Sequence, residues 1–156
     1  MRWGGAPGLM RARSSAATAP RTFLIFAMCA GPLGGLALYA AATLGVSLPV
    51  SNRGLVPLTT SLLLAPVLEE LVFRGGIQAI LERWLPVRFA LHGANVLTSL
   101  LFAIAHWMAA PAWLAASVFF PSLVFGRLKQ LHASLAPAML VHAWFNACFL
   151  LVLASR

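Results

Sequence analysis

Long uncharged apolar runs restrict what this chain can fold into more than any other feature. The first run extends from Thr22 to Val50 without a charged residue. A helix of about 20 residues crosses the hydrocarbon core of a bilayer, so this run is long enough to span a membrane. Only 9% of the 156 residues are charged, against about 25% in soluble domains. The chain is therefore predicted to be an all-α integral membrane protein, neither soluble nor disordered.

Four more apolar segments follow, and breaks that contain charged residues, proline or glycine separate them. They cover residues 55–81, 93–110, 112–126 and 133–154. This pattern predicts a bundle of about five transmembrane helices in one membrane-embedded domain, residues 22–156. In the second segment, Pro66 and Gly75-Gly76 predict a helix that is bent or broken at two places. The fourth segment is short and contains Pro121, so a tilted and a re-entrant arrangement both stay open.

Residues 1–21 form a separate basic segment that is rich in Arg, Gly, Ala and Ser and has no acid. We predict that this segment is a disordered cytoplasmic leader. A cleavable signal peptide is the alternative, although the apolar run that follows is longer than the hydrophobic region of such peptides.

The net charge of +8 comes from eleven basic and three acidic residues. With five crossings and a cytoplasmic N-terminus, eight basic residues fall on the cytoplasmic side and two on the other, as the positive-inside rule requires. The eight are Arg2, Arg11, Arg13, Arg21, Arg83, Arg88, Arg127 and Lys129, and the two are Arg53 and Arg156. The basic residues are scattered between apolar runs and form no patch, which excludes a nucleic-acid partner.

Two of the three acids, Glu69 and Glu70, lie side by side in the second apolar segment. An ionisable residue inside a membrane segment is a functional-site hypothesis by default. Glu70 and Arg74 are four residues apart, share a helix face and are expected to pair. Glu69 lies about 140° around the helix from Arg74, so it is left free for chemistry. An interfacial helix end with exposed charges is the alternative.

Two later segments add His106, His142 and Asn146. Taken singly, His106 indicates a tolerated or interfacial histidine, and the His142–Asn146 pair, four residues apart on one helix face, indicates hydrogen bonding between helices. Together with Glu69 they predict a polar pocket. In it, a carboxylate and an imidazole activate a water molecule, and a second histidine and an amide stabilise an oxyanion. This combination suits amide hydrolysis.

The same residues form three ordered motifs that resemble those of the CAAX-protease and bacteriocin-processing (CPBP or Abi) family of intramembrane proteases. The motifs are Glu69-Glu70-Leu-Val-Phe-Arg74, Phe102-Ala-Ile-Ala-His106 and His142-Ala-Trp-Phe-Asn146. The resemblance implies an Abi-like helical bundle and the following roles: Glu69 as the general base with His106 beside it, His142 and Asn146 as the oxyanion site, and Glu70 and Arg74 as supporting residues.

The resemblance also implies a glutamic-type protease without a cofactor. Its substrate would be a membrane protein or a C-terminally tagged peptide in the lipid bilayer, and its location the inner membrane of a bacterium with the N-terminus in the cytoplasm. The short chain further resembles the proteases of the JDVT-CTERM type, which are associated with bacterial C-terminal sorting tags.

Two alternatives use the same residues differently. In the first, Glu69, His106 and His142 are ligands of a catalytic zinc ion with water in the fourth position, although no His-Glu-x-x-His motif is present. In the second, the chain is a non-enzymatic transporter or scaffold subunit in which Glu69 and His106 relay protons.

Overall fold

The computed structural model describes residues 7–46 and 59–155, and for residues 7–18 and 87–91 it describes the backbone alone. Within these ranges the chain is helical and contains no strand, as the all-α fold class predicts. The elements are α1 (Pro7–Thr43), η1 (Thr60–Leu64), α3 (Ala65–Glu70), η2 (Leu71–Gln78), α4 (Ala79–Trp84), α5 (Val87–Trp107), α6 (Ala112–Ser117), α7 (Phe119–His132) and α8 (Ala136–Ala154), of which η1 and η2 are π-helical.

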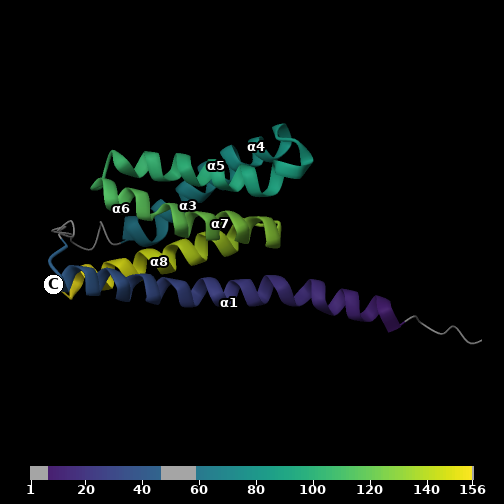
Figure 1. Ribbon diagram of the computed structural model, residues 1–156, viewed down its shortest axis with the longest axis horizontal. Helices are drawn as coiled ribbons and strands as arrows, with labels where there is room; N and C mark the ends of the chain where they lie inside the picture. Colours follow the sequence, from purple (N-terminus) through teal and green to yellow (C-terminus); the bar gives the residue numbers. More distant parts are fainter. Residues whose placement is uncertain (1–6, 47–58, 156) are drawn as a thin grey trace, which may run out of the picture.

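These elements form five helical units, one for each predicted apolar segment. The second unit is the continuous run from η1 to α4, and the fourth is α6 followed by α7. Figure 1 shows α1 and α8 side by side along one edge of the bundle and α5 along the opposite edge. Helix α7 lies between them and packs against both α5 and α8, so it is the central helix of the bundle.

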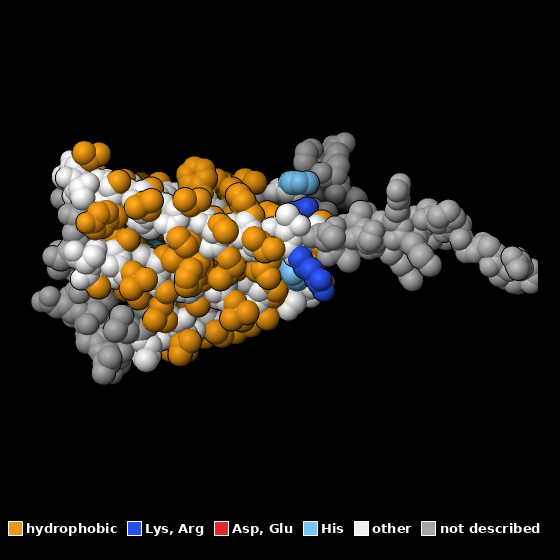
Figure 2. Space-filling model, turned by 90° about the horizontal axis from the view of Figure 1, so that it is seen from below, with side chains coloured by type: hydrophobic (Ala, Val, Ile, Leu, Met, Phe, Trp, Pro, Cys, Tyr) orange, Lys and Arg blue, Asp and Glu red, His pale blue; other side chains and the backbone are white. Residues whose placement is uncertain are grey.

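The polarity of this bundle is the reverse of that of a soluble domain. Large apolar side chains are exposed on many helices, among them Leu36, Leu63 and Leu151. Fully buried side chains include charged and polar ones. Figure 2 shows apolar side chains over most of the visible face and basic ones at one end. By length and composition, 19–43 and 136–154 are able to cross a membrane. The chain is an all-α membrane protein.

The start and the end of α1 differ from the prediction. Residues 7–21, predicted to be disordered, continue the helix because Ala, Leu, Met and Arg favour helices and Pro7 suits the first helical position. At the other end Gly45 adopts φ 93°. The Gly45 and Val46 N–H groups then bond to the Ala42 and Ala41 carbonyls, a Schellman ending. Residues 47–50 of the predicted span lie outside the described residues.

The break predicted between segments 55–81 and 93–110 is helical except at Leu85 and Pro86, and the break predicted at 127–132 is helical throughout. Two extended residues, Leu85 (ψ 145°) and Pro86 (ψ 142°), make the turn from α4 into α5. Helix α7 continues through its basic residues to His132 and ends where Ala133 turns left-handed (φ 49°). Pro121 lies in the first turn of α7, where no main-chain N–H is needed. The fourth segment is therefore a pair of helices that meet at Val118, rather than one short helix.

The second segment is not broken where its proline and glycines suggested. It is helical from Thr60 to Trp84, but it widens into π-helical turns on both sides of α3. Pro66 lies in the first turn of α3, directly after η1. Gly75-Gly76 lie inside η2. Pro66 and Gly75-Gly76 therefore mark the irregular turns of this segment, but the helix continues through these turns without a break.

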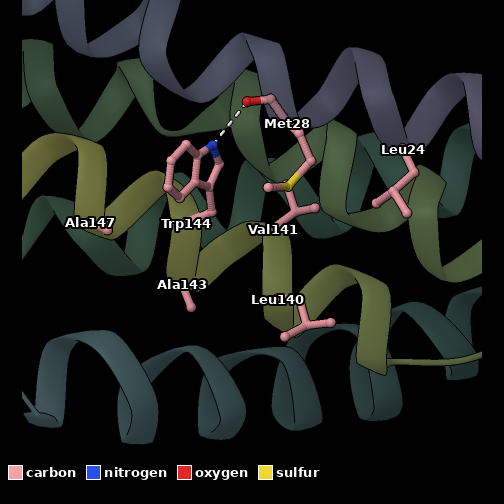
Figure 3. A pocket seen from close by; sticks show the side chains of 7 residues that line it. All are labelled: Leu24, Met28, Leu140, Val141, Ala143, Trp144 and Ala147. Atoms are coloured by element: carbon pink, nitrogen blue, oxygen red, sulfur yellow. Dashed lines mark hydrogen bonds between the residues drawn. The ribbon is translucent and has the colours of Figure 1, made fainter.

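Close packing of α1 on α8 depends on small residues and on one hydrogen bond across an apolar groove. A Cβ at Gly31 would come within 3.0 Å of the Trp144 ring. The groove has a volume of about 490 Å³, and Figure 3 shows its lining residues on the two helices. Across it the Trp144 Nε1–H donates to the Met28 carbonyl at 2.9 Å. This carbonyl lacks its helical donor because the residue four positions on is Pro32.

A polar cluster at the end of the second unit joins α4 to α7. The Glu82 carboxylate, which lies beyond the apolar part of its segment, accepts hydrogen bonds from Gln78, Lys129 and Gln130. Burial by itself would raise the pKa of Glu82, but hydrogen bonds from these three donors and the charge of Lys129 outweigh burial and hold the pKa below its ordinary value.

The two ends of the bundle agree with five crossings. The end of α4, the end of α7 and the N-terminal half of α1 lie at the same end in Figure 1, so Arg83, Arg127 and Lys129 share that end. Arg2, Arg53 and Arg156 of the charge count lie outside the described residues. The cytoplasmic orientation of the N-terminus stays a prediction.

The bond from Trp144 to the Met28 carbonyl gives a first prediction. Trp144→Phe removes the N–H donor and keeps an aromatic ring at this position. We expect it to lower the free energy of unfolding in detergent by about 1 kcal/mol. Pro32→Ala gives the Met28 carbonyl an N–H donor within α1. In the Pro32→Ala background, Trp144→Phe should therefore cost clearly less. Equal costs in both backgrounds would contradict this explanation.

The Glu82 cluster gives a second prediction. Because the pKa of Glu82 is lower in the folded than in the unfolded protein, its ionised form stabilises the fold above the unfolded pKa, and this contribution is lost as the pH falls through the folded pKa. Stability of the wild type in detergent should therefore fall on acidification in that range. Glu82→Gln should flatten this part of the pH profile, and an unchanged profile would show that the cluster does not contribute.

Candidate active site

The second helical unit places the two adjacent glutamates in different surroundings. Glu69 and Glu70 end α3, just before the π-helical turns of η2 begin. Glu70 is completely buried, whereas the Glu69 side chain is 31% exposed. The spacing argument paired Glu70 with Arg74 and left Glu69 free, and the structure places Arg74 against Glu70.

Glu70 pairs with Arg74, as predicted, and both side chains are completely buried. The Arg74 Nε lies 3.3 Å from the Glu70 Oε2. The guanidinium group lies over the Phe102 ring, with its carbon 5.3 Å from the ring centroid. Its Nη2 donates to the Ser122 Oγ at 2.7 Å and to the Ser122 carbonyl at 2.9 Å. Arg74 therefore connects η2 with α5 and α7.

His142 lies between the two glutamates. Its Nδ1 is 3.0 Å from the Glu70 Oε1, and its Nε2 is 3.6 Å from the Glu69 Oε2. The Phe125 ring stacks on the imidazole, with centroids 4.6 Å apart and planes at 15°. Since a carboxylate oxygen only accepts hydrogen bonds, Nδ1–H donates to Glu70. The ring is thus held at its edge by Glu70 and at its face by Phe125.

His106 approaches Glu69 from the end of α5. Its Nε2 lies 4.0 Å from the Glu69 Oε2, and its side chain is 30% exposed. Its Nδ1 lies 2.9 Å from the Phe102 carbonyl, which only accepts, so Nδ1 carries the hydrogen. In the neutral ring Nε2 is then a lone pair directed at Glu69. The structure brings Glu69, His106 and His142 together from three helical units.

Asn146 makes a hydrogen bond between helices, the contact that the His142–Asn146 pair taken singly indicates. Its Nδ2 donates to the Ser61 carbonyl of η1 at 2.9 Å. The Ala65 N–H bonds to the Thr60 carbonyl, and the next residue, Pro66, has no N–H to offer the Ser61 carbonyl. Asn146 donates to that carbonyl from α8. Since an amide nitrogen has two hydrogens, one remains for a further acceptor.

Sequence reasoning missed the residues that α7 adds to the site. Ser122 and Phe125 contact Arg74 and His142, yet α7 carries none of the three motifs. A weak signal was present for Gln78, which follows Glu70 and Arg74 at the same spacing of four and donates to the Gly126 carbonyl of α7. Asn95, which the motifs do not include, donates to the Leu123 carbonyl of the same helix.

The arrangement of the acidic and histidine side chains determines whether the site can hold a metal ion and what surrounds the Glu69 carboxylate. Among the described residues, no group of three or more His, Cys, Asp or Glu side chains is arranged to hold a metal ion. The Glu69 Oε2 is buried and has no hydrogen-bond partner within the same part of the chain. It faces two imidazole nitrogens at 3.6 and 4.0 Å, which are distances too long for direct hydrogen bonds.

Comparison with known proteins adds independent information. Residues 51–148 match the family model described as type II CAAX prenyl endopeptidase Rce1-like. The matched range includes every residue of the pocket described above, whereas α1 lies outside it. No curated protein and no solved structure matches the chain.

Proposed function

The chain belongs to the Rce1-like family of type II CAAX prenyl endopeptidases, and from this membership we propose that it is a membrane-embedded endopeptidase whose general base is Glu69. The family confirms the resemblance to CAAX proteases and makes the chain a protease of the membrane. The residue roles, the substrate and the absence of a metal are our proposals. The observation that supports them most is the approach of two imidazoles to one partly exposed carboxylate.

Glu69 suits the role of base better than Glu70 does. Glu70 is completely buried, and its oxygens face Arg74 and His142. Glu69 is partly exposed, as is His106, whose Nε2 lies 4.0 Å from the Glu69 Oε2. In the proposed mechanism a water molecule at the exposed side of this pair donates to the Glu69 carboxylate and to the His106 Nε2. In the proposed reaction Glu69 takes a proton from this water while the water oxygen attacks the peptide carbonyl. Glu69 then delivers that proton to the leaving amine.

His142 and Asn146 suit the stabilisation of the oxyanion. Glu70 holds the Nδ1 edge of His142, so the Nε2 of the same ring is the nitrogen that faces the site, 3.6 Å from the Glu69 Oε2. In the proposed role this Nε2 donates a hydrogen bond to the oxyanion. The second hydrogen of the Asn146 amide is available because only one is needed for Ser61. One donor of this kind typically contributes ~10²–10³ in rate.

The surroundings of the pocket suggest how substrate arrives. Apolar side chains near Glu69 and His106 are exposed on the lipid-facing surface, among them Leu68, Ile104 and Trp107. A substrate segment can therefore reach the pocket from within the bilayer. We propose a membrane-associated or C-terminally tagged protein as substrate, in the manner of the JDVT-CTERM proteases, and a bacterial inner membrane as the location.

Replacement of Glu69 tests the proposal. Because Glu69→Gln removes the base and keeps the shape, we expect a loss of cleavage of about 10²–10⁴-fold with unchanged membrane insertion. Cells that produce either form would be compared by quantitative proteomics of their membranes, and at least one protein should accumulate uncleaved with Glu69→Gln. Glu82→Gln, which removes the third carboxylate of the chain, is the matched control and should retain cleavage.

The two alternatives predict other outcomes of the same comparison. A transporter or scaffold predicts that no protein accumulates uncleaved with Glu69→Gln. Equal cleavage by the wild type and Glu69→Gln would contradict the role of Glu69.

Chelation tests the proposed absence of a metal. The purified wild type should cleave the protein identified above at the same rate before and after treatment with 1,10-phenanthroline, and elemental analysis should find zinc well below one ion per chain. A loss of activity that added zinc restores would favour the zinc alternative, with Glu69, His106 and His142 as ligands.

A further inference from the structure

Helix α7 contacts the pocket through two side chains that belong to none of the three motifs. We propose that one of them, Ser122, is a positioning residue for the proteolytic reaction, acting on His142 through Arg74 and Glu70. The inference rests on the proposed function for its catalytic consequence. Its structural part, the orientation of His142, stands on the contacts alone.

The directional contacts of the Arg74 guanidinium are those with Ser122. The Arg74 Nη2 donates hydrogen bonds to both the hydroxyl and the carbonyl oxygen of Ser122. By contrast, the Arg74 Nε and the Glu70 Oε2 are close in space but lack hydrogen-bond geometry, and neither atom has a hydrogen-bond partner within the described residues. Their attraction is a charge contact, which depends on distance far more than on angle. Ser122 therefore determines how the guanidinium is turned.

The position of Arg74 is passed on to His142. One oxygen of Glu70 faces Arg74 and the other accepts the Nδ1–H of His142 at 3.0 Å. A turned or displaced guanidinium would draw the Glu70 carboxylate with it and weaken this hydrogen bond. Since Nε2 of the same ring faces Glu69 at 3.6 Å, a small rotation of the imidazole changes the geometry at the proposed base.

The local structure of α7 supports this role. Ser122, Phe125 and Gly126 lie on one face of the helix because they are three and four residues apart. Ser122 is completely buried, and Phe125 stacks on His142 itself. A Cβ at Gly126 would overlap the Asn95 amide, so this glycine lets α7 approach α5 closely. Helix α7 thus holds both ends of the contact chain from Ser122 to His142.

The first test needs no substrate. The full chain, labelled with ¹⁵N-histidine and purified in detergent, gives ring nitrogen signals that report the hydrogen bond from the His142 Nδ1. We expect Ser122→Ala to move the His142 signals and to leave those of His92 and His132 in place. Ser122→Thr keeps the hydroxyl and should restore the wild-type signals. Ser117→Ala is the matched control, because the Ser117 hydroxyl bonds within its own helix to the Leu114 carbonyl.

The second test measures cleavage of the membrane protein that accumulates with Glu69→Gln. Ser122→Ala should lower kcat roughly ten-fold, the effect of losing one hydrogen bond to a charged group, with little change in KM. Ser117→Ala and Ser122→Thr should keep the wild-type kcat. A general loss of folded protein would instead lower the amount of active enzyme and disturb all the histidine signals.

The outcomes separate this inference from the proposed function. Unmoved His142 signals in Ser122→Ala, or signals in Ser122→Thr like those in Ser122→Ala, would overturn the positioning role whatever the activity shows. Moved signals with an unchanged kcat would overturn its catalytic consequence. If the wild type cleaves no protein, the proposed function fails, and the histidine signals still decide whether Ser122 orients His142.

Discussion

The buried guanidinium group of Arg74 is the constraint on which the pocket depends. A charge inside an apolar bundle is tolerated only when it is paired and hydrogen-bonded. Glu70 supplies the opposite charge, Ser122 supplies two acceptors and Phe102 supplies the face of its ring. These contacts require η2, α5 and α7 to meet at one place. The second oxygen of Glu70 then holds His142 and so adds α8. The ion pair thereby assembles the helices that carry the proposed chemistry.

Backbone carbonyls that proline leaves without a donor are a second organising element. The hydrocarbon core of a bilayer contains no water that could donate to them, so a donor from a neighbouring helix stabilises the fold. Pro32 has no N–H to offer the Met28 carbonyl, and Pro66 has none to offer the Ser61 carbonyl. Helix α8 donates to both carbonyls, from Trp144 toward α1 and from Asn146 toward η1. Asn146 therefore has a structural contact as well as its proposed catalytic role, and a variant at this position changes both.

Much of the fold was predictable because hydropathy reports directly on burial in lipid. The five apolar segments correspond to the five helical units, and Glu70 and Arg74 were paired from their spacing alone. The predicted ends were less accurate. The residues between segments 55–81 and 93–110, which include charged residues and Pro86, and residues 127–132 resemble loops, yet most of them belong to helices. Hydropathy marks where a helix leaves an apolar environment, whereas the helix itself ends where main-chain geometry changes, at Pro86 and at Ala133.

The sequence by itself determined that this is a helical membrane protein and which polar residues lie within its apolar segments, because both properties follow from the order of residue types along one chain. It also determined that Glu69 and Glu70 face different directions, since that follows from the geometry of a single helix. Only the tertiary structure decided that His142 bridges the two glutamates and that Ser122 and Phe125 of α7 contact the pocket. Those contacts depend on how separate helices approach and rotate against each other, which no spacing within one helix encodes.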